Sequence, residues 1–343
     1  MKTVALFNNK GGVGKTTLVY HLAHMLSRLG YPTLAVDLDP QANLTSAFFE
    51  DETVEALLEK GQDAGLTILG CVNPILEGTG DIQEAFPIDV AERLWTIAGD
   101  LGLSRFEDKL SENWPKCLMN DESALRVTSA FYRVTTKAAR SKGATVTLFD
   151  VGPNLGAINR AALLAADFLV VPLAADLFSL QGLKNLGPTV RTWREHWTLV
   201  RQLVLDKTTV DLPLGKMAPA GYVVLQHAVR LDRPVKAYGK WLARIPAVYR
   251  EAVLGQNSTQ PTAMPLSALR HAGDVADEHC LATLRNFRSL MPMAQDARKP
   301  MFDLKPADGA IGSHAQLVQT CAGEFRQLAE TIAETCGLQR TSV

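Results

Sequence analysis

The sequence predicts an α/β fold, with a doubly wound, mostly parallel sheet flanked by helices and a helical insertion. Short continuous apolar runs at residues 33–37, 94–98 and 146–150 are typical of parallel strands that are buried on both faces. Segments with helical apolar spacing, at 18–29 and 122–140, lie between these runs. The chain has 343 residues, 47% of them apolar, which is enough for a large core.

The composition argues against several classes of function. The net charge is −1, so any nucleic-acid binding must come from a local patch and not from the overall charge. Five cysteines are scattered without a C-x-x-C pair, which argues against a zinc site, an iron–sulfur cluster or a disulfide framework. The longest apolar stretch, 161–175, contains Asp167 and Pro172 and is too short to span a bilayer. We therefore expect a cytoplasmic protein without stable membrane insertion.

A glycine-rich loop follows the apolar run 4–7 and precedes the helical pattern that starts at residue 18. Its glycines let the backbone wrap around an anion, and the helix that follows adds its positive end. Lys15 would place an ammonium group on the β- and γ-phosphates, and Thr16 a hydroxyl on Mg²⁺. A chance glycine-rich turn is the alternative, which the flanking strand and helix disfavour. The pattern thus predicts a P-loop NTPase that uses ATP and Mg²⁺. The predicted nucleotide-binding residues are Lys10, Gly11, Gly12, Val13, Gly14, Lys15, Thr16 and Thr17.

The loop departs from the usual G-x-x-x-x-G-K-[ST] pattern in two ways. Asn9 stands where the first glycine is expected, and an additional lysine, Lys10, follows it. This deviant Walker A loop resembles that of the ParA/MinD family of SIMIBI-class ATPases. The resemblance implies a homodimer in which Lys10 reaches the partner's nucleotide, like an arginine finger supplied in trans. Lys10, Lys15 and Asp39 are then the expected catalytic residues.

Carboxylates follow two of the predicted strands. The segment 37–43 reads D-x-D-P-Q-A-N and resembles the family's second motif, with Ala42 where the family usually has glycine. By resemblance Asp39 positions the attacking water and Asp37 lies nearer the metal. Asp150 ends the strand at 146–150, where a Walker B aspartate holds Mg²⁺ through a water. The expected metal site is thus Thr16, Asp37 and Asp150; a pair of solvated turn aspartates at 37 and 39 is the alternative.

The resemblance covers residues 1–45, 90–103, 140–226 and 281–336 of one expected domain, 1–343. Within it, residues 167–182 resemble the family's A-D-x-h-h-h-P-x-x-x-(D/E)-x-F-x-x-x-G motif, where h is apolar. Gln226 would read the adenine edge. Residues 50–92 and 104–140 are expected to be variable helical segments, and 227–280 a family-atypical, basic helical insertion. Further expected elements are helices at 54–60, 82–85, 177–205 (kinked or restarted at Pro188) and 314–336, and strands at 167–172, 221–226 and 281–284.

Basic residues gather in the insertion. Lys236, Lys240 and Arg244 are spaced four apart, so on one helix they would share a face, opposite a stripe containing Trp241 and Tyr249. This face is either a phosphate-binding surface or a solvated surface that keeps the helix soluble. By resemblance Arg288 is a further candidate DNA contact, and a second basic cluster comprises Lys184, Arg191, Arg194 and Arg201.

These features favour an ATP-dependent dimerising switch of the ParA type. It would bind nonspecific DNA as the ATP dimer, associate with the nucleoid in that state, and be released when a ParB-like partner stimulates slow hydrolysis. Its role would be the partition of a plasmid, a chromosome region or other cargo. Because the phosphate loop begins at residue 10, we expect no N-terminal helix-turn-helix domain.

Three alternatives remain open. A MinD-like membrane-positioning ATPase needs a basic, aromatic amphipathic tail, which residues 337–343 do not provide. A metabolic or electron-transfer enzyme on the same fold would need cluster cysteines or a substrate pocket, and the sequence identifies neither. The insertion at 227–280 is compatible with a regulatory or effector ATPase that has a dedicated partner protein.

Overall fold

The computed structural model describes residues 1–225, 235–256 and 277–341. These residues form one eight-stranded sheet with the order β3-β4-β2-β5-β1-β6-β7-β8. Every pairing is parallel except that between β3 and β4, so the predicted fold class is confirmed. The strands are β1 (Lys2–Leu6), β2 (Thr33–Asp37), β3 (Ile88–Ala91), β4 (Leu94–Ile97), β5 (Val146–Asp150), β6 (Phe168–Ala174), β7 (Ala218–Leu225) and β8 (Cys280–Leu284).

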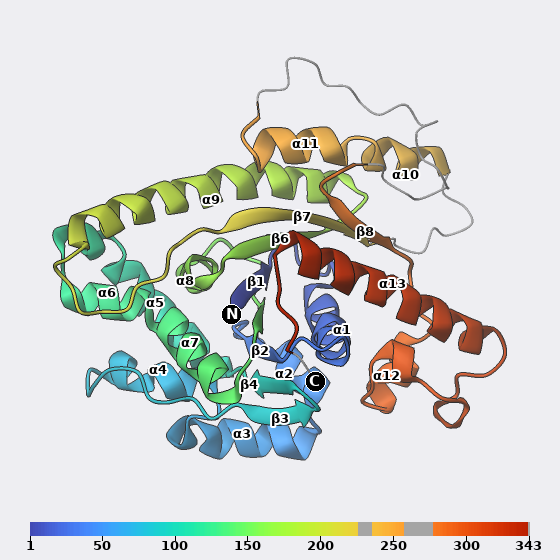
Figure 1. Ribbon diagram of the computed structural model, residues 1–343, viewed down its shortest axis with the longest axis horizontal. Coiled ribbons are helices and arrows are strands. Elements are labelled where there is room, and N and C mark those ends of the chain that lie inside the picture. Colours follow the sequence, from blue (N-terminus) through green and yellow to red (C-terminus); the bar gives the residue numbers. More distant parts are fainter. Residues whose placement is uncertain (226–234, 257–276, 342–343) are drawn as a thin grey trace.

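Helices cover both faces of the sheet (Figure 1). One face packs against α1 and α13, and the other against α4 to α9 and α11. The α-helices are α1 (Lys15–Arg28), α2 (Asn43–Phe48), α3 (Asp51–Ala64), α4 (Ile68–Glu77), α5 (Phe106–Asn113), α6 (Glu122–Thr128), α7 (Ala130–Lys142), α8 (Ala157–Ala165), α9 (Leu177–Val204), α10 (Val235–Leu242), α11 (Ile245–Ala252), α12 (Met291–Asp296) and α13 (Ser313–Thr335). The 3₁₀ helices are η1 (Leu101–Arg105), η2 (Pro115–Met119), η4 (Met301–Asp303) and η5 (Pro306–Asp308).

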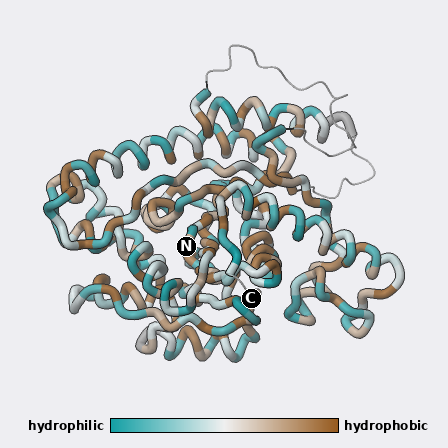
Figure 2. Tube along the Cα trace, viewed as in Figure 1, coloured by the Kyte–Doolittle hydropathy of each residue, from teal (hydrophilic) through white to brown (hydrophobic). Residues whose placement is uncertain are grey.

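The continuous apolar strands form the centre of the core, where brown segments concentrate (Figure 2). In β1 successive side chains point to opposite faces: Val4 and Leu6 join the core under α1 and α13, whereas Ala5 joins the core of the other face. Because both faces are covered, every residue of β2 and β5 is buried. This double burial explains why these strands lack the alternation of a half-exposed sheet.

Two predicted helices are wrong. Residues 82–85 are not helical: the segment 82–87 has no regular secondary structure, and the amides of Gln83 and Phe86 donate to the carbonyls of Cys71 and Gly65. The predicted helix at 122–140 is two helices, α6 and α7, separated at Ser129. The Ser129 hydroxyl donates to the Leu125 carbonyl (2.7 Å) and accepts from Arg133 Nε (3.1 Å). Such bonds of serine to the preceding turn compete with regular helix geometry.

The basic insertion also differs from the expectation. α10 ends at Leu242 and α11 begins at Ile245, so Lys240 and Arg244 do not share the face of one helix. Pro246 in the first turn of α11 explains the break, because proline has no amide hydrogen for a continuing helix. Of the predicted apolar stripe, Ile245 and Tyr249 lie on α11 and are fully buried against the core, whereas Trp241 lies on α10 and is half-buried. Gln226 and the Lys236 side chain lie outside the described residues.

The long helix α9 runs through Pro188 as one continuous helix instead of restarting there. Pro188 is exposed, so water can satisfy the carbonyl that loses its intrahelical partner. On the opposite side α11 packs closely: a Cβ on Gly187 would lie 1.8 Å from the Ala252 carbonyl oxygen. Within the described parts of the chain, no helix is both long and apolar enough to cross a bilayer.

Candidate functional site

The glycine-rich loop joins β1 to α1 at the carboxyl edge of the sheet. Gly12 and Gly14 have left-handed backbone angles (φ 70° and 78°), which side chains other than glycine rarely adopt. Gly14 is the N-cap residue of α1 and, as a glycine, has no side chain to cap the helix. The first amides of α1 therefore remain available, as expected for a helix N-terminus that binds an anion.

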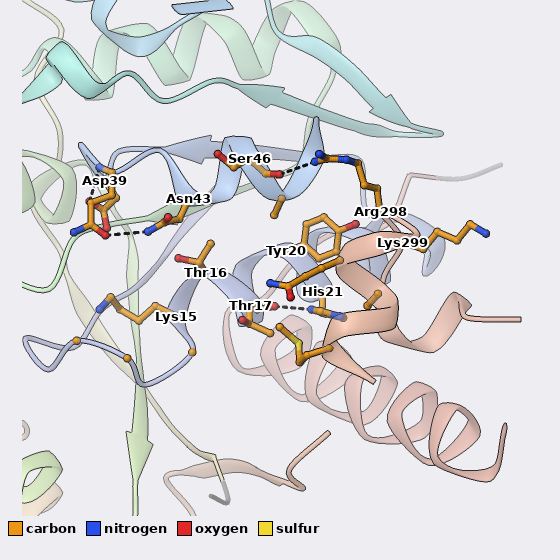
Figure 3. A pocket seen from close by; sticks show the side chains of 18 of the residues that line it. Lys15, Thr16, Thr17, Tyr20, His21, Asp39, Asn43, Ser46, Arg298 and Lys299 are labelled. Atoms are coloured by element: carbon orange, nitrogen blue, oxygen red, sulfur yellow. Dashed lines mark hydrogen bonds between the residues drawn. The ribbon is translucent and has the colours of Figure 1, made fainter. Parts of the chain in front are cut away.

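Lys15 is buried, and its ammonium lies over the loop (Figure 3). Lys15 Nζ donates to the carbonyls of Asn8 (3.2 Å) and Lys10 (3.4 Å). Burial lowers the pKa of Lys15, while the nearby Asp150 and Asp39 carboxylates oppose this shift. The loop thus surrounds a lysine that bonds to two backbone carbonyls, which a phosphate can replace.

Asn8 and Asn9 anchor the loop to the neighbouring elements. Asn8 Nδ2 donates to the Pro172 carbonyl on β6 (2.7 Å), and Asn8 Oδ1 accepts from the Lys10 amide (3.0 Å). Both asparagines press against Gly182 of α9, where a Cβ would lie 2.8 Å from Asn9 Oδ1 and 3.1 Å from Asn8 Oδ1. Gly182, the glycine of the 167–182 motif, therefore leaves room for the phosphate loop. The sequence alone does not show this role of Gly182.

Replacing Gly182 with alanine is expected to displace the loop and to weaken nucleotide binding about tenfold, since misplaced binding groups cost this much or more. Titration calorimetry with a non-hydrolysable ATP analogue measures the effect. Gly323→Ala is the matched control: Gly323 lies within α13, and a Cβ added there would have no described atom within 4 Å. That control should bind normally and gain about 0.5–1 kcal/mol of stability. Equal affinities in the two variants would contradict this role of Gly182.

Lys10 points away from its own phosphate loop. Its ammonium forms an ion pair with Asp176, which also caps α9 by accepting from the Ser179 amide (2.8 Å). Burial alone would raise the pKa of Asp176, but hydrogen bonds from Lys10 and Ser179 hold it below its usual value. The Lys10 ammonium also lies 6.0 Å from the centroid of Phe178, a ring that is 71% exposed. Lys10 is therefore at the rim of the site, beside an exposed apolar side chain.

Asp150 has the environment of a metal-shell carboxylate. It is fully buried, and neither of its carboxylate oxygens has a hydrogen-bond partner within the described structure. Burial and the neighbouring Asp37 raise its pKa well above the usual value, while Thr16 and Lys15 oppose this. Buried oxygens without a partner are costly. A hydrated cation at Asp150 and Thr16 would fit them.

Asp37 has hydrogen-bond partners within the protein, and its place in the metal shell stays a prediction. It lies in register with Asp150 on the adjacent strand. Its Oδ2 accepts from the amide and the hydroxyl of Thr45 (2.8 and 2.7 Å), and its Oδ1 accepts from the Asp39 amide (3.3 Å). Burial raises the pKa of Asp37, which these bonds partly offset. Asp37 therefore holds the loop before α2 in place.

Asp39 lies on that loop and faces the phosphate loop. Its Oδ1 accepts from the Gln41 amide (3.0 Å), and its carboxylate is close enough to Lys15 to oppose the lowering of that pKa. A Cβ on Gly152 would come within 3.4 Å of Asp39 Oδ1, so the loop after Asp150 closes against this carboxylate. The structure thus brings Lys15, Asp39 and Asp150 together, as the sequence predicts.

Lys15 and Asp39 line a cavity of about 830 Å³ that extends along α1 to Tyr20, Arg298 and Lys299 (Figure 3). Arg298 does not project freely into it, because Arg298 Nη1 donates to the Ser46 carbonyl (3.1 Å) and Arg298 Nη2 to Asp51 Oδ1 (3.0 Å). The guanidinium instead ties the end of α2 to the segment after α12.

A second cavity of about 210 Å³ adjoins the same loop. Its walls include Gly12, Leu225, Asn286 and Phe287, and Asn286 Nδ2 is buried without a partner in the described residues. An amide that can donate here is suited to the edge of a base, a role that the sequence predicts for Gln226. Arg288 also lines this cavity, so the structure places this predicted DNA contact beside the phosphate loop.

Comparison with known proteins places this geometry in a family. The family model AAA_31, described as an AAA domain, matches residues 1–203. The sporulation initiation inhibitor protein Soj of Bacillus subtilis is 30% identical over 196 residues, which cover 57% of this chain and 67% of Soj. Protein IncC of Escherichia coli is 29% identical over 211 residues, 62% of this chain and 51% of IncC. The chain thus spans about half the length of IncC and two thirds of Soj.

Solved structures share the fold over almost the whole chain. Protein DIP2308 of Corynebacterium diphtheriae has a TM-score of 0.66 at 22% identity and covers 98% of this chain and 99% of its own. A putative plasmid partition protein of Borrelia burgdorferi, bound to AMPPNP, has a TM-score of 0.55 at 17% identity, with 97% and 98% covered. With its deviant phosphate loop and this pattern of matches, the chain belongs to the AAA_31 family of ParA- and Soj-type P-loop proteins.

Proposed function

We propose that this chain is an ATP-hydrolysing switch of the ParA type, in which ATP drives the association of two copies. The observation that carries the proposal is the division of labour between two lysines. Lys15 lies over the phosphate loop with Asp39 and Asp150 around it, whereas Lys10 turns outward to Asp176. Lys10 belongs to the phosphate loop, but its side chain is directed away from it. Such a lysine is suited to contact the nucleotide of a partner subunit.

In the proposed reaction each residue of the site has one task. The free amides at the start of α1 and Lys15 bind the β- and γ-phosphates. Asp39 orients the attacking water, and Asp150 with Thr16 holds Mg²⁺. When bound, the cation neutralises charge on the phosphate oxygens. Asn286 is proposed to contact the adenine in the second cavity, where its amide nitrogen has no partner among the described residues.

The carboxyl edge of the sheet is the proposed dimer surface. Leu101, Leu177 and Phe178 are exposed by 58%, 51% and 71%, and all three lie in segments that follow strands at this edge. Lys10 stands beside Phe178. Association of two copies through this edge would bury these apolar side chains and bring Lys10 toward the partner's nucleotide, which supports an active form with two subunits.

Nonspecific DNA is the proposed ligand of the ATP dimer. Lys240 and Arg244 lie near the Trp241 ring, with 5.7 and 5.2 Å from their cationic groups to its centroid. Among the described residues neither forms an ion pair, which supports a contact of both with phosphates. Arg191 of the second basic cluster has a different role, because it donates to the Ala252 carbonyl at the end of α11.

DNA binding measured against nucleotide state and salt tests this proposal. The wild type should bind random-sequence duplex DNA with ATP and not with ADP. The variant Lys240→Glu/Arg244→Glu should bind about tenfold or more weakly, with a salt slope reduced by about two. Lys116→Glu/Lys207→Glu, at two exposed lysines elsewhere, is the charge-matched control. DNA binding that is equal with ATP and ADP would refute the proposed switch. Equal DNA affinities of the two double variants would mean that Lys240 and Arg244 do not contact DNA.

The C-terminal segment packs against the body of the molecule. Arg340 Nε donates to the Tyr31 hydroxyl (3.1 Å), and the Thr341 amide donates to the Gly30 carbonyl (3.2 Å). Residues 338–341 are thus held against the turn between α1 and β2, where they do not form an amphipathic helix. Cytoplasmic location, nucleoid association in the ATP state and a ParB-like activating partner remain parts of the proposal.

A further inference from the structure

Glu107 of α5 caps a helix that lies far from it in sequence. Its Oε1 accepts from the Ala157 amide (2.5 Å), and its Oε2 accepts from the Ile158 amide (2.8 Å). These are the first two amides of α8, which has no side-chain cap from its own N-cap residue, Gly156. A carboxylate that accepts from both amides satisfies two otherwise unpaired donors and lies at the positive end of the helix.

The loop that α8 anchors is part of the nucleotide site. Residues 151–156 join Asp150 to α8, and Pro153 lines the large cavity beside the phosphate loop. Asn159, in the first turn of α8, binds this loop: its Nδ2 donates to the carbonyls of Gly152 (2.9 Å) and Asn154 (2.7 Å). The position of the loop therefore depends on the position of the start of α8.

Glu107 fits closely against the end of this loop. A Cβ on Gly156 would lie 2.5 Å from Glu107 Oε1, so the carboxylate directly abuts the backbone there. Arg160 of α8 provides a nearby cation: burial lowers the pKa of Arg160, and the charge of Glu107 opposes this. The Arg160 guanidinium is itself held over the Trp114 ring, 4.4 Å from its centroid. The carboxylate is thus held by two amides of α8, with the charge of Arg160 in its neighbourhood.

We propose that Glu107 is a positioning residue for ATP hydrolysis, which fixes the start of α8 and thereby keeps the loop 151–156 in place beside Asp39. This inference rests on the proposed ATPase function. The hydrogen bonds of Glu107 go to α8 and not to Lys15 or the amides of the phosphate loop. Its loss should therefore slow the chemical step and leave ATP affinity largely unchanged, because binding depends on the phosphate loop.

The test compares Glu107→Ala and Glu107→Gln with Asp121→Ala. Asp121 is a matched control, since it caps α6 by accepting from the Ala124 amide (3.1 Å) and is not part of the loop 151–156. In Glu107→Ala we expect kcat to fall about tenfold, with the Kd for an ATP analogue changed by less than about twofold. Glu107→Gln keeps one acceptor oxygen and should retain an intermediate rate. Asp121→Ala should keep the wild-type kcat.

Hydrogen exchange without nucleotide provides a second readout that needs no turnover. The amides of Ala157 and Ile158 should exchange at least about tenfold faster in Glu107→Ala, and remain protected in Asp121→Ala. Unchanged exchange at these amides, or an equal loss of kcat in Asp121→Ala, would overturn the inference. A parallel rise in Kd would also overturn it. If the wild type itself fails to hydrolyse ATP, the proposed function is refuted, and the exchange data still decide whether Glu107 anchors α8.

Discussion

Replacing Lys15 with alanine is expected to abolish nucleotide binding and to leave the fold intact. The ammonium supplies charge-assisted hydrogen bonds to phosphate from a buried position, and such bonds contribute about 1.5–3 kcal/mol each. An affinity loss of about 100-fold or more is therefore expected, which corresponds to about 2.7 kcal/mol. Without nucleotide, Lys15 makes two long hydrogen bonds, to the carbonyls of Asn8 (3.2 Å) and Lys10 (3.4 Å). Its removal should thus change the Tm of the free protein little.

Titration calorimetry with an ATP analogue and thermal unfolding without it measure these two effects. Lys216→Ala is a suitable control, because Lys216 pairs with Asp167 at the surface (3.5 Å) and does not line the cavity. The control should bind normally. If Lys15→Ala bound ATP within about threefold of the wild type, the loop would not be the phosphate site.

Replacing Asp39 with alanine is expected to separate binding from hydrolysis. Asp39 lines the cavity opposite Lys15, and its carboxylate accepts from the Gln41 amide of its own loop. Because the phosphate loop does not depend on that bond, nucleotide binding should persist. Hydrolysis should fall about 100-fold or more, a typical cost of losing the group that orients or activates the nucleophile. The protein should accumulate as an ATP-bound dimer, since the step that releases it is blocked.

Phosphate release and size-exclusion chromatography with ATP measure this result. Asp51→Ala removes a carboxylate that lines the same cavity but pairs with Arg298, so it should hydrolyse ATP at the normal rate. A normal rate in Asp39→Ala would mean that another group positions the water. A loss of ATP binding would mean that Asp39 supports the loop and not the reaction.

The parts of the site that the sequence predicts are those built from contiguous residues. Strand, glycine loop and helix follow one another within residues 2–28, while Asp150 ends the buried strand β5 and Asp39 lies two residues after the end of β2. Because parallel strands end at one edge of the sheet, these groups must come together. The left-handed backbone angles of Gly12 and Gly14 are also predictable, because they depend on the local sequence of the loop and glycine adopts them readily.

The parts that the sequence could not reveal depend on long-range partners. Lys10 pairs with Asp176, 166 positions away, and Glu107 caps α8 some 50 positions away. The hydrogen bonds from Thr45 to Asp37 were likewise not predicted from the sequence. The prediction of a helix at 82–85 is wrong for the same reason, because the Gln83 amide donates to the carbonyl of Cys71 on α4. Local patterns carry no information about such contacts.

A mixing experiment tests most directly whether Lys10 acts in trans. Lys10→Ala and Asp39→Ala are each expected to hydrolyse ATP poorly alone. When they are mixed in equal amounts before ATP is added, half of the dimers should be mixed. In a mixed dimer, the Lys10→Ala subunit keeps its own Asp39 and receives Lys10 from its partner. The mixture should then regain about a quarter of the wild-type rate, because one site in half of the dimers is complete. No recovery above the sum of the separate variants would contradict a lysine supplied by the partner.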